Sequence, residues 1–136
     1  MMNIKQIAEK YNLNKEDFWE LKRKDKTGNL VSMYPPKWII THDACEKIAE
    51  KANIQFGSPT IFRDNNKDIA MVGDAKRGNK VIWSTGEASP TNCKAPYPFA
   101  MAEKRLKDRL TLKLINAYEY GIYSDVEADS FKKEKS

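Results

Sequence analysis

The chain has 136 residues, of which 40% are hydrophobic and 32% are charged, and it contains six glycines and six prolines. This composition is typical of one globular domain and excludes a disordered or fibrous protein. The formal net charge is +5, and the excess lies in residues 58–117, which hold 11 basic and 6 acidic side chains. Such an excess fits binding to a polyanion, because lysine and arginine displace counterions from phosphates, and it fits a lysine-rich soluble protein equally well.

The two cysteines, Cys45 and Cys93, are far apart and have no cysteine neighbours at zinc spacing. We therefore expect reduced, structural thiols and a cytoplasmic protein. Residues 1–12 lack the apolar core of a signal peptide, and no apolar run approaches the length of a membrane span. The sequence thus predicts no membrane partner.

The first 37 residues are expected to form a helical element followed by a basic loop. Residues 3–23 predict one or two short helices, the second of them capped by Asn14. A helix-turn-helix that reads duplex DNA is disfavoured, because the second helix would be acidic, and docking onto a larger domain or a subunit is the favoured alternative. Residues 22–37 predict a loop that begins with a cluster of four basic side chains, which either touch phosphates or belong to a solvated linker. In this loop Tyr34 offers a ring for stacking on a base, whereas Trp38 is expected in the core. The four basic residues are Lys22, Arg23, Lys24 and Lys26.

Residues 38–123 predict an α-β-β-β-α core. A helix over residues 43–52 begins with Asp43 and Glu46 at capping-box spacing, and His42 is expected to make a local hydrogen bond near this cap instead of binding a metal. Strands over residues 60–63, 68–76 and 80–85 are joined by short turns, which indicates an antiparallel meander. The second hairpin carries Lys76, Arg77 and Lys80.

The longest helical pattern runs from Tyr97 to Tyr123, with a basic edge beside its apolar stripe. A second apolar side predicts that the helix packs on two sides, against the meander and against the tail or a neighbouring subunit. Lys113 falls within the core-facing stripe, so it must reach out or find a partner. The stripe comprises Phe99, Ala102, Leu106, Leu110, Leu114 and Ala117, the basic edge Arg105, Arg109 and Lys113, and the second side Met101, Leu112 and Ile115.

Together these patterns predict an α+β fold, with a three-stranded antiparallel meander packed on a long C-terminal helix and with N-terminal helices. Residues 1–136 are expected to form a single domain. Residues 124–136 are expected to form a short acidic helix and a tail. The acids Asp125, Glu127 and Asp129 lack the glycine and spacing of a calcium loop, so no metal or other cofactor is expected.

Catalytic motifs are scarce, and we expect a protein that is not an enzyme. There is no nucleophile elbow, phosphate-binding loop or dinucleotide-binding glycine pattern. Asp74 and Lys76 have the acid-x-lysine spacing of metal-dependent nucleases, in which Asp64 or Asp68 would supply the second Mg²⁺ ligand. A Mg²⁺-dependent nuclease is therefore one alternative, and a small regulator that binds duplex DNA through residues 3–23 is another.

Several short strings in the second half of the chain resemble one family. These are Gly86-Glu87-Ala88-Ser89 with Asn92, Tyr97-Pro98, Ala102-Glu103-Lys104-Arg105 with Asp108-Arg109, and Tyr120-Gly121-Ile122-Tyr123-Ser124 with Glu127-Ala128-Asp129. The pattern resembles phage single-strand annealing proteins, which are similar to the ring-forming eukaryotic strand-annealing mediator. The resemblance covers about residues 38–130.

The resemblance implies ATP-independent binding of single-stranded DNA and annealing of complementary strands in phage recombination or replication. It implies a homo-oligomer, ring or filament, in the host cytoplasm, with a phage exonuclease or a single-strand-binding protein as further partners. The DNA backbone would lie in a basic groove between the meander and the long helix. The matching positions are Lys104, Arg105 and Arg109 on the helix, and Lys76, Arg77 and Lys80 match the hairpin by position. Tyr97 and Trp83 would add stacking if exposed, although both are expected in the core.

Overall fold

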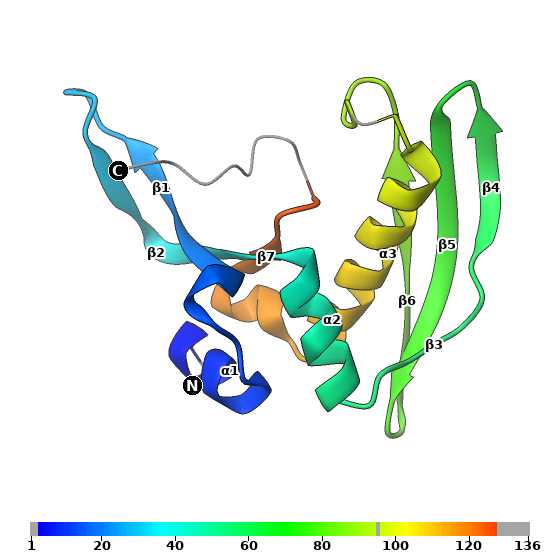
Figure 1. Cartoon of the computed structure of the whole chain (residues 1–136), viewed down its shortest axis with the longest axis horizontal. Helices are drawn as coiled ribbons and strands as arrows, with labels where there is room; N and C mark the ends of the chain where they lie inside the picture. Colours follow the sequence, from blue (N-terminus) through cyan, green and yellow to red (C-terminus); the bar gives the residue numbers. More distant parts are fainter. Residues whose placement is uncertain (1–2, 95, 128–136) are drawn as a thin grey trace.

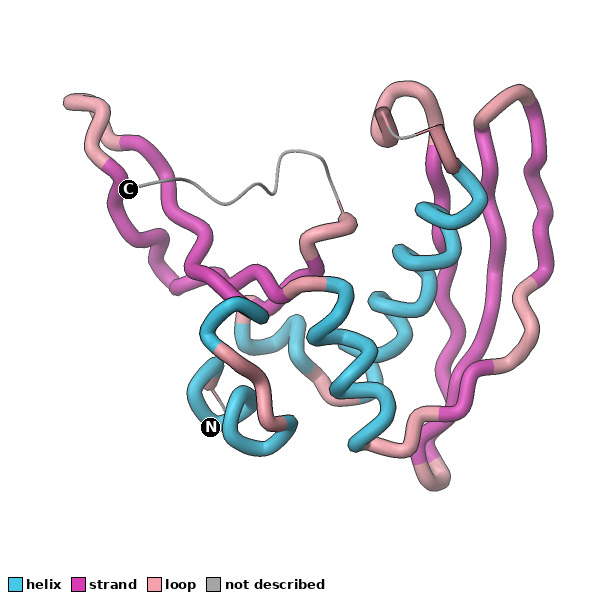
Figure 2. The backbone as a smooth tube through the Cα atoms, viewed as in Figure 1, coloured by secondary structure: helices cyan, strands magenta, loops and turns pink. Residues whose placement is uncertain are grey.

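In the computed structural model, which describes residues 3–94 and 96–127, two β-sheets flank a central group of helices (Figures 1 and 2). The first half contains α1 (Ile4–Tyr11), the 3₁₀ turn η1 (Lys15–Asp17), β1 (Phe18–Lys24), β2 (Leu30–Ile40), α2 (His42–Lys51) and β3 (Gln55–Phe56). The second half contains β4 (Thr60–Asn65), β5 (Asp68–Arg77), β6 (Lys80–Ala88), α3 (Pro98–Leu114), the 3₁₀ turn η2 (Ala117–Tyr120) and β7 (Ile122–Ser124).

The first sheet has the strand order β1-β2-β7, with β1 antiparallel and β7 parallel to β2. The ladder between β1 and β2 shifts between Leu21, which faces Lys37, and Lys22, which faces Ser32. Residues 33–36 of β2 consequently have no partner in β1, and Pro35 and Pro36 occupy this irregularity, where a missing N–H costs no ladder bond. Beyond it the β1–β2 hairpin projects away from the body of the molecule (Figure 1).

The second sheet is built around β5. The strand β6 pairs with β5 along its whole length, from Arg77 opposite Lys80 to Ile69 opposite Ala88. The strands β3 and β4 pair with opposite ends of β5 and therefore follow one another along its other side. The sheet is an antiparallel meander whose first strand is broken between Phe56 and Thr60.

Helix α3 begins at Pro98, whose fixed φ suits the first turn, and it packs on two hydrophobic clusters. Leu106, Leu110 and Leu114 belong to the cluster on the inner face of the second sheet. Leu112 belongs to the cluster formed by α1, α2, β2 and β7. The helix thus joins the two halves of the fold.

The helix approaches β6 closely because residue 86 is a glycine. A Cβ added to Gly86 would meet the carbonyl oxygen of Ala102 and would lie 2.7 Å from the Cβ of Leu106. Any larger side chain would push α3 away from the sheet.

The architecture expected from the sequence is wrong in several places. Residues 18–24 and 30–40 form strands of a first sheet, not a second helix and a loop, because their apolar side chains alternate between a core face and an opposite face. The long helix ends at Leu114 and not at Tyr123, since Asn116 and Gly121 adopt left-handed conformations and a strand follows. The acidic helix from residue 124 does not begin in the described residues, and its remainder lies outside them. The subdivision into a helical element over residues 1–37, a core over residues 38–123 and a helix over residues 124–136 therefore does not match the elements.

Candidate nucleic-acid interface

Arg105, a predicted DNA contact, is buried instead of exposed. Its side chain is 1% exposed, and its guanidinium donates to the carbonyl oxygens of Val126, Glu87 and Asn92 and to the Asn92 side chain. The bonds to Glu87 and Asn92 are 2.7–2.9 Å long. A guanidinium that is fully enclosed and bonded in this way cannot reach a phosphate, so Arg105 is a structural residue.

Arg109 is also occupied within the chain. Its Nη2 lies 2.8 Å from a carboxylate oxygen of Glu87 and 2.8 Å from one of Glu127, and its Nη1 donates to the carbonyl oxygen of Thr85 at 2.9 Å. Hydrogen bonding to Arg109 holds the pKa of Glu87 below its usual value. With two carboxylates on one guanidinium, Arg109 is not free to bind DNA, and its assignment as a DNA contact is wrong.

Both arginines cap an open strand edge. The carbonyl groups of Thr85 and Glu87 point away from β5, because alternate residues of β6 bond to that strand. Arg109 takes the first of these oxygens and Arg105 the second. The two side chains therefore fasten α3 to the edge of the sheet.

Asp108, between the two arginines, anchors the other side of α3. One carboxylate oxygen accepts from Ser124 Oγ at 2.6 Å, and the other lies 2.8 Å from Nδ1 of His42. The second imidazole nitrogen lies 2.7 Å from Glu46. The hydrogen bond to Asp108 raises the pKa of His42. From the sequence, His42 was expected to make only a local hydrogen bond near the cap of α2. The cap of α2 is in fact Thr41, whose hydroxyl accepts from the Ala44 N–H.

Eight of the residues behind the family resemblance are parts of this internal network. They comprise Gly86, Glu87, Asn92, Arg105, Asp108, Arg109, Ser124 and Glu127. These positions hold α3 against the sheet and against residues 124–127. Their side chains therefore hold the fold together and do not make a DNA-contacting surface.

Lys104 is partly exposed, and it forms no ion pair with the described residues. It lies far from the hairpin cations, because Lys80 reaches Asn116 at the opposite end of α3. The ten helical residues from Lys104 to Leu114, where α3 ends, already span about 15 Å at about 1.5 Å each. Moreover, α3 packs directly on the meander, so the expected basic groove between them is absent from the described part of the chain.

The β5–β6 hairpin keeps its cations at the surface. Lys76 and Lys80 are exposed, Arg77 is partly exposed, and none of the three forms an ion pair with another described residue. Trp83, expected in the core, is 68% exposed, and its neighbour on the same face, Val81, is 64% exposed. On this face the strand register places Lys76 opposite Val81 and Asp74 opposite Trp83, whereas Arg77 and Lys80 pair on the other face. The hairpin thus combines three cations with an exposed ring.

Of the other aromatic residues considered in the sequence, some are exposed and one packs in the core. Tyr97 is 52% exposed at the start of α3, also against expectation, whereas Trp38 packs on the cluster with Phe18 as expected. Tyr34 is 98% exposed in β2. Lys113 is exposed, but its ammonium reaches Ser84 at 3.2 Å, so it finds a polar partner at the sheet.

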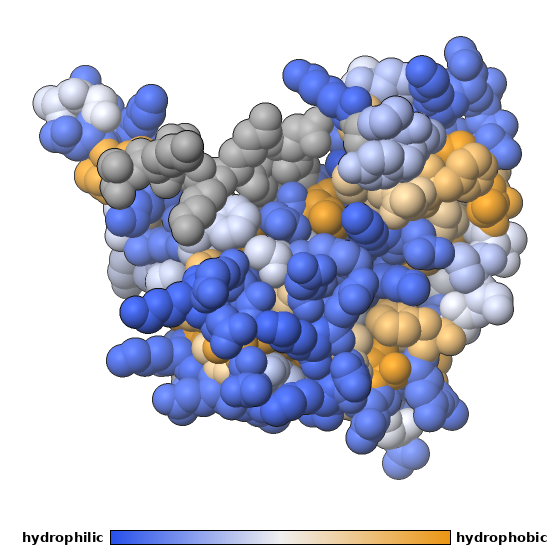
Figure 3. Space-filling model, in the orientation of Figure 1, coloured by the Kyte–Doolittle hydropathy of each residue, from blue (hydrophilic) through white to orange (hydrophobic). Residues whose placement is uncertain are grey.

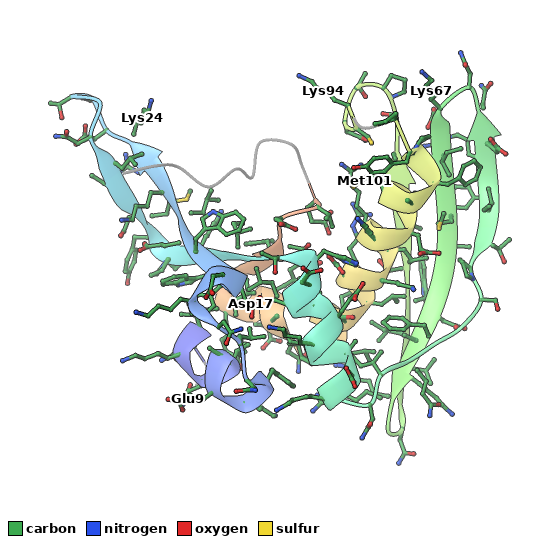
Figure 4. All side chains as sticks on the ribbon, viewed as in Figure 1. Glu9, Asp17, Lys24, Lys67, Lys94 and Met101 are labelled. Carbon is green, nitrogen blue, oxygen red and sulfur yellow. The ribbon has the colours of Figure 1, made fainter. Side chains whose placement is uncertain are left out.

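The projecting β1–β2 hairpin is a second basic surface, which the sequence described only as a loop. Lys22, Arg23, Lys24 and Lys26 are all exposed on it, and Lys24 points away from the body in Figure 4. Asp25 is the acid at its tip, where it accepts from Thr27 and Asn29 and closes the turn. Hydrophilic residues dominate the face seen in Figure 3, and the apolar surface is concentrated near α3 and the second sheet.

The nuclease alternative fails on geometry. Asp64 pairs with Ile69, five residues along β5 from Asp74, which corresponds to about 16 Å. Asp68 is still farther from Asp74 and forms an ion pair with Arg63. Among the residues that the structure describes, no group of three potential ligands could hold a metal ion. The helix-turn-helix alternative fails as well, since α1 is followed by a strand.

No protein-family model matches the chain, and a search of curated proteins finds no match. Within the described residues, no helix is both long and apolar enough to cross a membrane.

Proposed function

We propose that this protein binds single-stranded DNA through the β5–β6 hairpin and anneals complementary strands without ATP. The observation that carries the proposal is the exposed Trp83 ring on a basic hairpin, with Lys76 on the same face of the sheet and with Arg77 and Lys80 on the opposite face at the tip. A large exposed ring on a hairpin whose three cations form no ion pair with the described residues suits a strand whose bases stack while its phosphates are neutralised. The resemblance to phage annealing proteins supports the annealing step, assembly into a homo-oligomer, and action in the cytoplasm of an infected host.

The mechanism is physical and involves no covalent step. The three cations fix the backbone by displacing counterions, and Trp83 stacks on one base. Arg105 and Arg109 act indirectly, because they keep β6 attached to α3 and so keep the hairpin in place. Bases that are not stacked remain available to a complementary strand.

Binding is tested by fluorescence anisotropy with a labelled oligothymidine over a series of salt concentrations. Three phosphate contacts predict that log K falls with log salt with a slope of about −2. The variant Lys76→Ala/Arg77→Ala/Lys80→Ala should lose most of this slope. Trp83→Ala should weaken binding about tenfold, since stacking contributes about 1–3 kcal/mol per base.

A matched control removes the same charge elsewhere. Lys5, Lys15 and Lys51 are exposed and form no ion pair within the described residues. The variant Lys5→Ala/Lys15→Ala/Lys51→Ala should retain the salt slope apart from the small effect of net charge. Equal loss in both triple variants would show that binding follows net charge only and would refute the hairpin site.

Annealing is tested with two labelled complementary strands in EDTA and without nucleotide. Faster pairing than in the absence of protein is expected, and it should disappear in the hairpin variant. Strand cleavage that requires Mg²⁺ would replace this proposal with a nuclease. Native mass spectrometry of the same samples tests the homo-oligomer.

A further inference from the structure

A pocket of about 370 Å³ lies between β2, η2 and the start of α1, away from the β5–β6 hairpin. Its walls are mainly aromatic and prolyl: Pro35, Pro36, Trp38, Tyr118, Tyr120 and Tyr123. This volume lies in the range of pockets that bind small organic molecules. No residue of the proposed hairpin site lines it.

The rings of this aromatic pocket are wall residues, each fixed from behind. Trp38, Tyr118 and Tyr120 pack on the hydrophobic cluster that includes Ile40 and Ile122, yet all three remain partly exposed. Tyr118 and Tyr123 stand with ring centroids 5.7 Å apart and planes at 48°. Rings held in this way lose little freedom when a flat group packs against them.

Two of the lining rings, those of Tyr118 and Tyr120, carry hydroxyl groups. Burial raises the pKa of Tyr118, so its hydroxyl stays protonated and can donate. The pocket therefore offers polar atoms as well as apolar walls, as a ligand with a polar edge requires.

Positive charge gathers on one side of the aromatic pocket. Lys37 lines it, and the register places Lys37 opposite Leu21, next to Lys22 at the base of the basic β1–β2 hairpin. The acid among the described lining residues is Glu119, which is exposed. The surroundings therefore favour a ligand that combines a flat apolar group with negative charge.

We propose that the aromatic pocket binds the base of a nucleotide, with the phosphate toward Lys37. The ligand class follows from the flat walls and the adjacent cations. The inference rests on the proposed single-strand binding only in one respect, namely that the nucleotide would belong to a bound strand. Aromatic walls also suit a polyproline helix, but such a peptide has no negative charge to satisfy Lys37 and the basic hairpin.

The test is a ¹H–¹⁵N NMR titration of the full chain with deoxyadenosine monophosphate. Shifts are expected at Lys37, Trp38 and residues 118–123. Deoxyadenosine, which lacks the phosphate, should produce the same pattern with severalfold weaker affinity. Decaproline is the competing probe and should produce no shifts there.

Two variants report on different parts of the pocket. Tyr120→Ala should weaken binding of the monophosphate about tenfold through lost stacking. Lys37→Ala should weaken binding of the monophosphate but not binding of deoxyadenosine. Because it removes no aromatic ring, it still tests the pocket if Tyr120→Ala fails to fold. Tyr34→Ala is the control, because Tyr34 is exposed in the same strand but does not line the pocket.

The inference is overturned if the monophosphate causes no chemical-shift changes at concentrations up to about 10 mM, because even a millimolar dissociation constant would be detected there. It is also overturned if shifts fall outside the pocket or if only decaproline binds there. The hairpin variant separates the two proposals, because Lys76→Ala/Arg77→Ala/Lys80→Ala should leave monophosphate binding unchanged. Loss of single-strand binding with an intact nucleotide response would thus implicate the hairpin alone.

Discussion

Replacing Arg105 with alanine should destabilise the fold rather than remove a DNA contact. The change removes four hydrogen bonds and leaves the carbonyl oxygens of Glu87 and Asn92 enclosed without a donor. Each stranded buried acceptor costs about 1–3 kcal/mol, so the free energy of unfolding should fall by about 4 kcal/mol. For 136 residues this corresponds to a fall of about 14 °C in Tm. Because domains are stable by only about 5–15 kcal/mol, the variant should be close to unfolding.

Urea denaturation followed by circular dichroism measures this effect. Lys104→Ala is the control, since Lys104 is the preceding residue on the same helix, is partly exposed, and forms no ion pair with the described residues. Its free energy of unfolding should change by less than about 0.5 kcal/mol. A folded Arg105→Ala protein with unchanged stability and lost DNA binding would refute the buried assignment and restore the helix as the DNA site.

Three further outcomes follow from the contacts of α3. Gly86→Ala should lower the free energy of unfolding by about 1–3 kcal/mol in urea melts, because the new methyl group meets the backbone of α3. Gly73→Ala should be milder, because its methyl group meets the flexible end of Leu106 and lies at ordinary contact distance from Pro59. The pKa of His42 is raised in the folded protein, so the interaction with Asp108 stabilises the fold fully below the unfolded pKa of 6.5 and is lost as pH rises through the folded pKa. The difference in free energy of unfolding between wild type and His42→Gln should therefore become smaller at alkaline pH. Arg109→Leu should return the pKa of Glu87 toward its usual value, which an NMR titration of the carboxyl would report.

The sequence predicted the local features of the second half better than those of the first. Turn residues and apolar runs located three strands between residues 60 and 88, and prolines located the start of α3. The residues around Phe18 and Trp19 follow an acidic, helix-like start, and they become a strand only by pairing with Ile39 and Ile40. Such long-range pairing overrides local propensity and leaves no clear trace in a single sequence.

The candidate site was predicted in part, and the errors have one cause. Arg105 was placed on a basic edge because arginine is usually exposed, but it lies beside Ala102 on the face that meets the sheet. Its partner Asn92 is distant in sequence, so no spacing rule connects the two. Leu112 was correctly placed on a second apolar side, and that side meets α1, α2 and the first sheet. The exposure of Trp83 was missed because an alternating strand pattern does not say whether its second face is covered.

The capped edge of β6 limits how copies of this chain can join. An open strand edge normally serves as a template on which a strand from another molecule can extend the sheet. At Thr85 and Glu87 that template is blocked, because arginine side chains occupy the outward carbonyl oxygens. A sheet that continued from β6 into a second copy of this chain could therefore form only at the hairpin end of β6, near Val81.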